Sequence, residues 1–181
     1  MDQITPLILQ LTSTSVNDRF TAARALAAHG PNASPAIPHL IAALSDSNGP
    51  VTDSVTWALG AIGENAIEPL AKAARSGDSQ LHRRMACYAL GRYAPHATAK
   101  MTILSSLLND SDPEIRRAAA GSLISLGQHL GRDHEYRDSP LSDDEAAAAK
   151  QLHPLISTFV GDETLDSEFA EQALMWLTPL R

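Results

Sequence analysis

The sequence predicts an all-α solenoid, in which pairs of helices stack and share one core. A small residue followed by leucine recurs at steps of 33, 31, 33 and 51 residues, at Ala25-Leu26, Ala58-Leu59, Ala89-Leu90, Ser122-Leu123 and Ala173-Leu174. A repeat length in this range is typical of repeat architectures. Hydrophobic residues make up 44% of the chain but aromatic residues only 4%. The core must therefore be built from Ala, Leu and Ile on closely packed helices.

The clearest copy of the repeated helix begins near residue 112. Asp112 is a good N-cap and Pro113 suits the first helical turn. Four apolar residues then fall on one helical face at the spacing i, i+4, i+8 and i+11: Ile115, Ala119, Leu123 and Leu126. This spacing predicts an amphipathic helix with one buried stripe.

A shorter apolar helix precedes each copy, at residues 4–11, 37–44, 67–74, 101–108 and 152–159. Neither helix of a pair can bury its apolar stripe alone, so the two must pack together and against the next pair. We expect a single domain, 1–181, with repeats at about 3–30, 35–63, 66–94, 97–130 and 145–179, and an insertion at 131–144.

Helix ends are also predicted. The stretch Ser15 to Asp18 has capping-box spacing, and so does Ser142 to Glu145. Glycine commonly follows the last helical residue, so Gly30, Gly63 and Gly127 are expected to mark helix ends.

The order Pro-Leu-x-x-Leu-Leu-x-Asp, then Val-Arg-x-x-Ala-Ala-x-Ala-Leu-Gly-x-Ile-Gly, resembles the HEAT repeat, especially the short bacterial variety of phycobilin-lyase-type proteins. The resemblance covers residues 4–130 and resumes at 145–178. It implies a right-handed α-solenoid of about five helix pairs, whose second helices line a concave surface where partners bind. It also implies a structural ladder between neighbouring repeats, made by Arg19, Arg83 and Arg116 with Asp46 and Asp110.

Charge and composition exclude several classes of function. The net charge is −7, and the whole excess lies in residues 131–181, which hold 4 basic and 11 acidic side chains against 10 and 10 in residues 1–130. A nucleic-acid-binding protein normally presents a basic excess, so this balance counts against that role. Neither a signal peptide nor a membrane span is predicted. The lone Cys87 agrees with a reducing compartment, and we expect a cytoplasmic monomer.

No catalytic residue, metal site or cofactor is predicted. The seven histidines lie in different repeats without ligand spacing on one helix face. Deoxyhypusine hydroxylases, which are HEAT-like, hold iron with several His-Glu pairs, whereas this chain has only His134-Glu135. Cys87 lies beside the apolar face, where a packed thiol is expected rather than a nucleophile.

One face of the chain has the residue types of a binding surface. It is the side of the second helix of each pair that faces away from the predicted core. With Ile115 as position zero and the copies aligned on the small residue and leucine that they share, positions two, six and nine point away from the predicted core; the ninth includes Ala27, Gly91 and Ile124. Trp, Tyr and Arg dominate binding hot spots, and this face collects them in a chain poor in aromatic residues. The candidate partner-binding residues are Phe20, Arg24, Asp53, Trp57, Arg84, Tyr88 and Arg117.

The sequence therefore predicts a non-enzymatic protein–protein interaction module or scaffold that binds a partner on its concave face, as an inhibitor or assembly factor. The acidic C-terminal end favours a partner with a basic surface. Two alternatives stay open: a bilin-lyase-like or chaperone role, and a HEAT-like DNA glycosylase. Such glycosylases use aromatic, Asp and Arg side chains on a concave surface. That set is superficially similar to Asp53, Trp57, Arg84 and Tyr88. The charge balance counts against the second.

Overall fold

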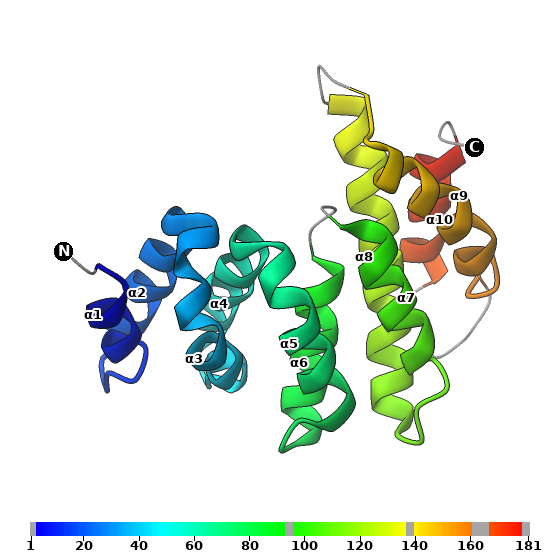
Figure 1. Ribbon diagram of the computed structural model, residues 1–181. Helices are drawn as coiled ribbons and strands as arrows, with labels where there is room; N and C mark the ends of the chain where they lie inside the picture. The colour runs from blue at the N-terminus through cyan, green and yellow to red at the C-terminus, as the bar shows by residue number, and fades with distance from the viewer. Residues whose placement is uncertain (1–2, 93–95, 137–139, 161–166, 179–181) are drawn as a thin grey trace. The chain divides into compact units, whose positions relative to one another are not determined.

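A computed structural model describes residues 3–92, 96–136, 140–160 and 167–178. Throughout these residues the regular structure is helical, with short turns between helices (Figure 1). The chain divides into two compact units, residues 1–89 (unit 1) and 90–181 (unit 2). The predicted all-α fold is confirmed, while one continuous right-handed stack stays a prediction.

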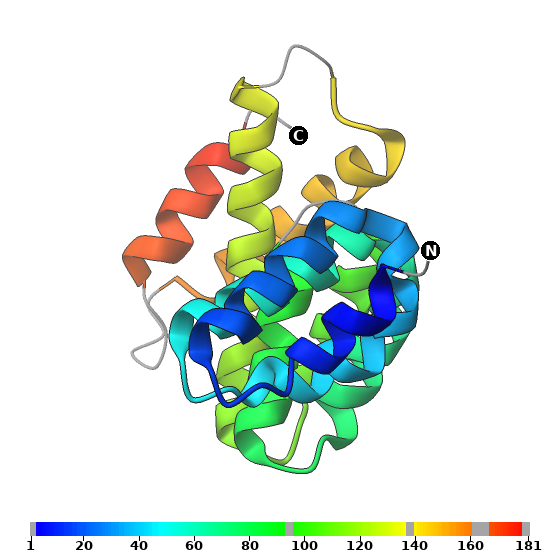
Figure 2. The same ribbon diagram turned by 90° about the vertical axis from the view of Figure 1, so that its left-hand side faces the viewer.

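Unit 1 is built from helix pairs. Its elements are α1 (Ile4–Gln10), α2 (Val16–His29), η1 (Gly30–Ala36), α3 (Ile37–Ala42), η2 (Ala43–Ser45), α4 (Gly49–Ile62), α5 (Glu64–Ser76) and most of α6 (Gln80–Gly91). Figure 2 shows α1 and α2 as an antiparallel pair. The second helices α2 and α4 pack along each other, which places their outward faces side by side.

The predicted helix ends in unit 1 are confirmed. The Ser15 hydroxyl accepts a hydrogen bond from the backbone N–H of Asp18 at 3.3 Å, which caps α2. The backbone N–H of Ser15 donates to the Ser13 hydroxyl at 3.1 Å and not to the Asp18 carboxylate, so only half of the predicted capping box forms. Gly30 ends α2 with φ +53° and Gly63 ends α4 with φ +79°. A side chain at either position would be strained, which explains glycine there.

The core of unit 1 consists of aliphatic side chains from both helices of each pair. Leu26, Leu40, Leu44 and Leu59 are fully buried or nearly so. Alanines fill the closest contacts, as Ala22 does on α2. Small side chains let helix axes approach closely, so a core poor in aromatic residues is still densely packed.

Unit 2 contains α7 (Ala97–Leu107), α8 (Pro113–Tyr136), α9 (Asp143–Ser157) and α10 (Ser167–Leu177). The predicted stripe of α8 is fully buried: Ile115, Ala119, Leu123 and Leu126. Asp112 accepts a hydrogen bond from the backbone N–H of Glu114 at 2.9 Å, in agreement with its predicted capping role. The capping box at the start of α9, between Ser142 and Glu145, is confirmed.

One expectation about the end of the fourth repeat is wrong. Gly127 does not end a helix, because α8 continues to Tyr136. A Cβ at Gly127 would lie 2.7 Å from Cδ1 of Ile156, so this glycine makes room for α9 instead. The insertion also begins as helix, since residues 131–136 belong to α8. Leu130 is fully buried, and this apolar contact favours the extra turns. Residues 137–139 lie outside the described part.

Candidate functional site

Three of the candidate residues form one cluster on unit 1. Phe20 and Arg24 are one turn apart on α2, and Trp57 lies on the neighbouring α4. The guanidinium carbon of Arg24 is 5.1 Å from the centroid of the Trp57 ring and 5.7 Å from that of Phe20. Both distances are within the range of cation–π attraction. We name Phe20, Arg24 and Trp57 the α2–α4 cluster.

The cluster is open to solvent. Trp57 is 40% exposed, Arg24 is exposed and Phe20 is half-buried. The opposite sides of the same helices are closed, because Leu26 and Leu59 are buried. A rigid core therefore presents a partly exposed indole ring and a guanidinium that already contact each other.

The other candidates in unit 1 lie on α4 and α6. Asp53 is exposed one turn before Trp57, Tyr88 is 41% exposed, and Arg84 is half-buried. The ring contacts join only the members of the α2–α4 cluster among the residues that the structure describes. Whether Arg84 and Tyr88 extend its binding surface stays a prediction.

Arg117 is placed differently. It lies on α8 in unit 2, where its Nη1 donates to Oε1 of Glu114 at 2.6 Å, one helical turn away. Both side chains are partly exposed, and such exposed pairs contribute little stability. Arg117 therefore has a local carboxylate partner.

The structural role predicted for the ladder arginines is supported most clearly at Arg19. Its Nε donates to Oδ2 of Asp46 at 2.6 Å and its Nη2 to Oδ1 at 3.0 Å, which is a bidentate pair between neighbouring repeats. Arg83 donates to the carbonyl of Ala74 at 2.9 Å, and Arg116 to that of Asp110 at 2.8 Å. Arg83 therefore joins α6 to the last turn of α5, and Arg116 joins α8 to the turn that precedes it.

We expect Asp46→Ala to lower the free energy of unfolding by about 1–2 kcal/mol, because it removes three hydrogen bonds from a largely buried carboxylate. The guanidinium of Arg19 lowers the pKa of Asp46 below its usual value of 3.8. The stabilisation is therefore present above pH 3.8 and lost as the pH falls through the lower pKa of the folded state. Urea unfolding at pH 7 and pH 3 measures both effects. Asp78→Ala, at an exposed carboxylate, should change little; equal losses in both variants would contradict the prediction.

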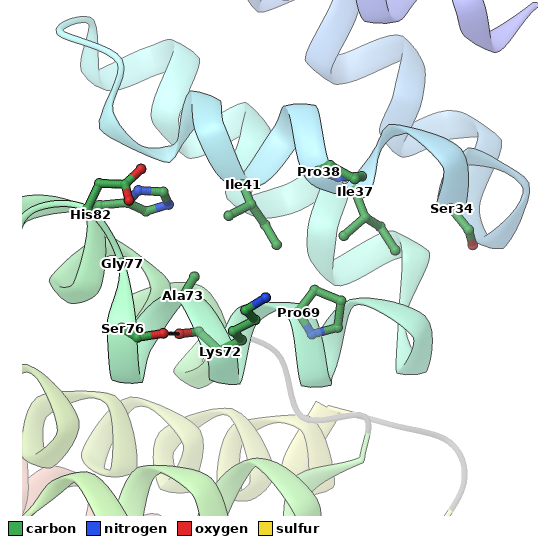
Figure 3. A pocket seen from close by; sticks show the side chains of 11 residues that line it. Ser34, Ile37, Pro38, Ile41, Pro69, Lys72, Ala73, Ser76, Gly77 and His82 are labelled. Atoms are coloured by element: carbon green, nitrogen blue, oxygen red, sulfur yellow. Dashed lines mark hydrogen bonds between the residues drawn. The ribbon is translucent and has the colours of Figure 1, made fainter.

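An apolar groove of about 550 Å³ lies between the first helices α3 and α5 of unit 1. In Figure 3, Ile37 and Ile41 point toward α5, where Pro69 and Lys72 lie opposite them. His82 lies at one end, and its buried Nε2 has no hydrogen-bond partner within the described structure. Sequence reasoning missed this groove, because its walls belong to helices whose apolar residues were assigned to the core.

Unit 2 contains a buried lysine that sequence reasoning also missed. Lys100, on α7, is only 5% exposed. Burial lowers its pKa to about 8, and the nearby carboxylate of Asp144 opposes this shift. Asp144 is held at the start of α9, where its carbonyl accepts a hydrogen bond from the Thr98 hydroxyl at 3.2 Å. A lysine on an amphipathic helix is normally solvated, so the sequence contains no signal for this burial.

Within the described part of the chain, no three His, Cys, Asp or Glu side chains form a group able to hold a metal ion. Cys87 is fully buried, as expected for a packed thiol. None of the described helices is both long and apolar enough to cross a membrane.

The fold and the α2–α4 cluster together define a helical-repeat protein that presents side chains on its second helices. The particular class follows from comparison with known families: the model for HEAT repeats matches residues 4–81 and again residues 67–134. The chain belongs to the HEAT repeat family, and this confirms the resemblance seen in the sequence.

Two solved structures illustrate what the chain is similar to. The complex of CpcE and CpcF of phycocyanin lyase from Nostoc sp. PCC7120 is 22% identical, with a TM-score of 0.50 over 96% of each chain. A computationally designed armadillo repeat protein for modular peptide recognition is 18% identical, with a TM-score of 0.41 over 96% of this chain and 81% of that one. No curated protein matches the sequence significantly. At these identities the similarity extends to the fold alone.

Proposed function

We propose that this chain is a non-enzymatic protein-binding module, which acts as an inhibitor or assembly factor and contacts its partner through the α2–α4 cluster. The observation that carries the proposal is the partly exposed Trp57, held against Arg24 on a closed helical core. Trp and Arg are the residue types most enriched in binding hot spots. Surface tryptophans gain much apolar burial when a partner covers them.

Preorganisation supports the same function. The cation–π contacts restrict Arg24 and Trp57 before any partner arrives, so less side-chain entropy is lost on association. Asp53, Arg84 and Tyr88 would extend the contact surface. The acidic excess of residues 131–181 would steer a partner with a basic surface toward the protein.

Affinity capture from the native host, followed by titration of the captured protein in pure form, tests the proposal. Trp57→Ala should weaken binding about 30-fold or more, as expected when a hot-spot tryptophan is removed. The matched control is Leu9→Ala, which removes a 69% exposed apolar side chain from α1 and should bind like the wild type. Circular dichroism confirms that both variants remain helical. Equal binding by Trp57→Ala and the wild type would refute the role of the cluster.

The same experiments separate the two alternative functions. A chromophore or phycobiliprotein captured with the chain would favour the bilin-lyase-like role. Tight binding of an abasic DNA duplex at low salt would favour the glycosylase.

A further inference from the structure

Arg24 differs from other arginines of the second helices in its hydrogen bonding. Arg19 forms a bidentate pair with Asp46, and Arg117 pairs with Glu114. Arg24 contacts the two rings of the α2–α4 cluster, and no acceptor among the described residues takes a hydrogen bond from it. Its guanidinium thus lies beside two aromatic rings on an exposed side chain, and its N–H donors are available to a partner.

This arrangement suits a planar oxyanion. A guanidinium whose N–H groups have no protein acceptor can donate two of them in parallel to the two oxygens of a carboxylate. An incoming partner that covers Trp57 would also exclude water from Arg24. Exclusion of water strengthens a charge-assisted hydrogen bond, because the local dielectric constant falls.

We propose that Arg24, positioned by Phe20 and Trp57, binds the carboxylate of an acidic side chain of the partner protein. The inference rests on the proposed function, since it names the chemistry that the α2–α4 cluster recognises. A nucleic-acid phosphate would fit the same guanidinium edge. The equal numbers of basic and acidic side chains in residues 1–130 favour a protein carboxylate, because a polyphosphate needs a basic surface. A partner with a basic surface overall can still place one carboxylate at Arg24.

The probe is hexaglutamate with an acetylated N-terminus and an amidated C-terminus, titrated into the full chain at low salt and followed by NMR at the Trp57 indole N–H and the Arg24 Nε–H. Hexaglutamine and hexalysine with the same blocked ends are the matched neutral and cationic peptides. We expect saturable shifts at both signals with hexaglutamate only. Arg24→Lys keeps the charge but loses the planar fork, and it should weaken hexaglutamate binding about ten-fold. The control is Arg75→Gln, at a half-exposed arginine on α5 whose Nη1 lies 3.5 Å from Glu68; it should bind hexaglutamate like the wild type.

Several outcomes would overturn the inference: no shift with hexaglutamate, equal shifts with hexaglutamine, or equal affinity in Arg24→Lys and the wild type. A 12-base-pair DNA duplex that binds Arg24 more tightly than hexaglutamate would overturn it in favour of phosphate. Partner capture separates the two proposals. Capture that survives Arg24→Gln but is lost in Trp57→Ala leaves the proposed function intact and removes the carboxylate. Capture that survives both variants removes the proposed function as well.

Discussion

Replacing Gly91 with alanine should destabilise unit 2, although the same change stabilises most helices. A Cβ at Gly91, the last residue of α6, would lie 2.5 Å from the backbone oxygen of Ser122 and 2.7 Å from its Cα, on α8. These are backbone atoms, so no side-chain rotation relieves the clash. Forcing an extra carbon into a packed contact costs about 1–3 kcal/mol. The gain in helix propensity from Gly to Ala is about 1 kcal/mol at most and smaller at a helix end.

Gly121→Ala is the matched control for Gly91→Ala. Gly121 lies inside α8, and a Cβ there meets no atom within 4 Å. We therefore expect Gly121→Ala to raise the free energy of unfolding by up to about 1 kcal/mol. Thermal unfolding followed by circular dichroism measures both variants. The explanation fails if the two alanines change the midpoint in the same direction by the same amount.

The contrast between Gly91 and Gly121 shows which aspect of burial could not be predicted from the sequence. Gly91 was expected to point outward at the ninth position of its copy, yet it is buried, and so are Ala27 and Ile124 at the same position. A second helix packs against its own first helix and also against neighbouring elements, so a wider arc is buried than one apolar stripe predicts. The spacing of apolar residues in the sequence therefore predicts the middle of the buried helix face more accurately than the residues at its edges.

Local chemistry was predictable because it depends on residues close in sequence. The caps at Ser15 and Ser142 and the turn glycines Gly30 and Gly63 all follow from rules that span a few residues. Gly127 obeys the same sequence rule, but α8 continues through it. Its packing against α9 depends on residues about 30 positions away, which no local rule includes.

The residues of the candidate site could be predicted from the sequence, but the contacts between their side chains could not. Outward spacing alone selected Phe20, Arg24 and Trp57, whereas their ring contacts depend on how α2 packs along α4. Arg117 met the same spacing rule, and its pairing with Glu114 needed side-chain geometry. The groove between α3 and α5 likewise depends on helix packing.

Lys100→Met should stabilise the protein at pH 7, and the gain should disappear at high pH. The pKa of Lys100 is about 8 in the folded protein, compared with 10.5 for an ordinary lysine. A difference of this size corresponds to a free-energy cost on the order of 3 kcal/mol for carrying the buried charge. Methionine has a similar length and no charge, so it removes this cost while filling the space. Asp144 is exposed and stays hydrated after the substitution.

The dependence on pH separates this mechanism from simple repacking. Between pH 8 and pH 10.5 the unfolded chain holds a proton on Lys100 that the folded protein has released, so the wild type gains stability as the pH rises through this window. Below pH 8 the full cost applies, and above pH 10.5 it is gone. The stability difference between Lys100→Met and the wild type should therefore shrink across the window.

Urea unfolding at pH 7, 9 and 10.5 measures this difference. Lys150→Met, at an exposed lysine of α9, should stay within about 0.5 kcal/mol of the wild type throughout. A gain in Lys100→Met that is constant with pH would mean that packing, and not the buried charge, controls the stability of this site.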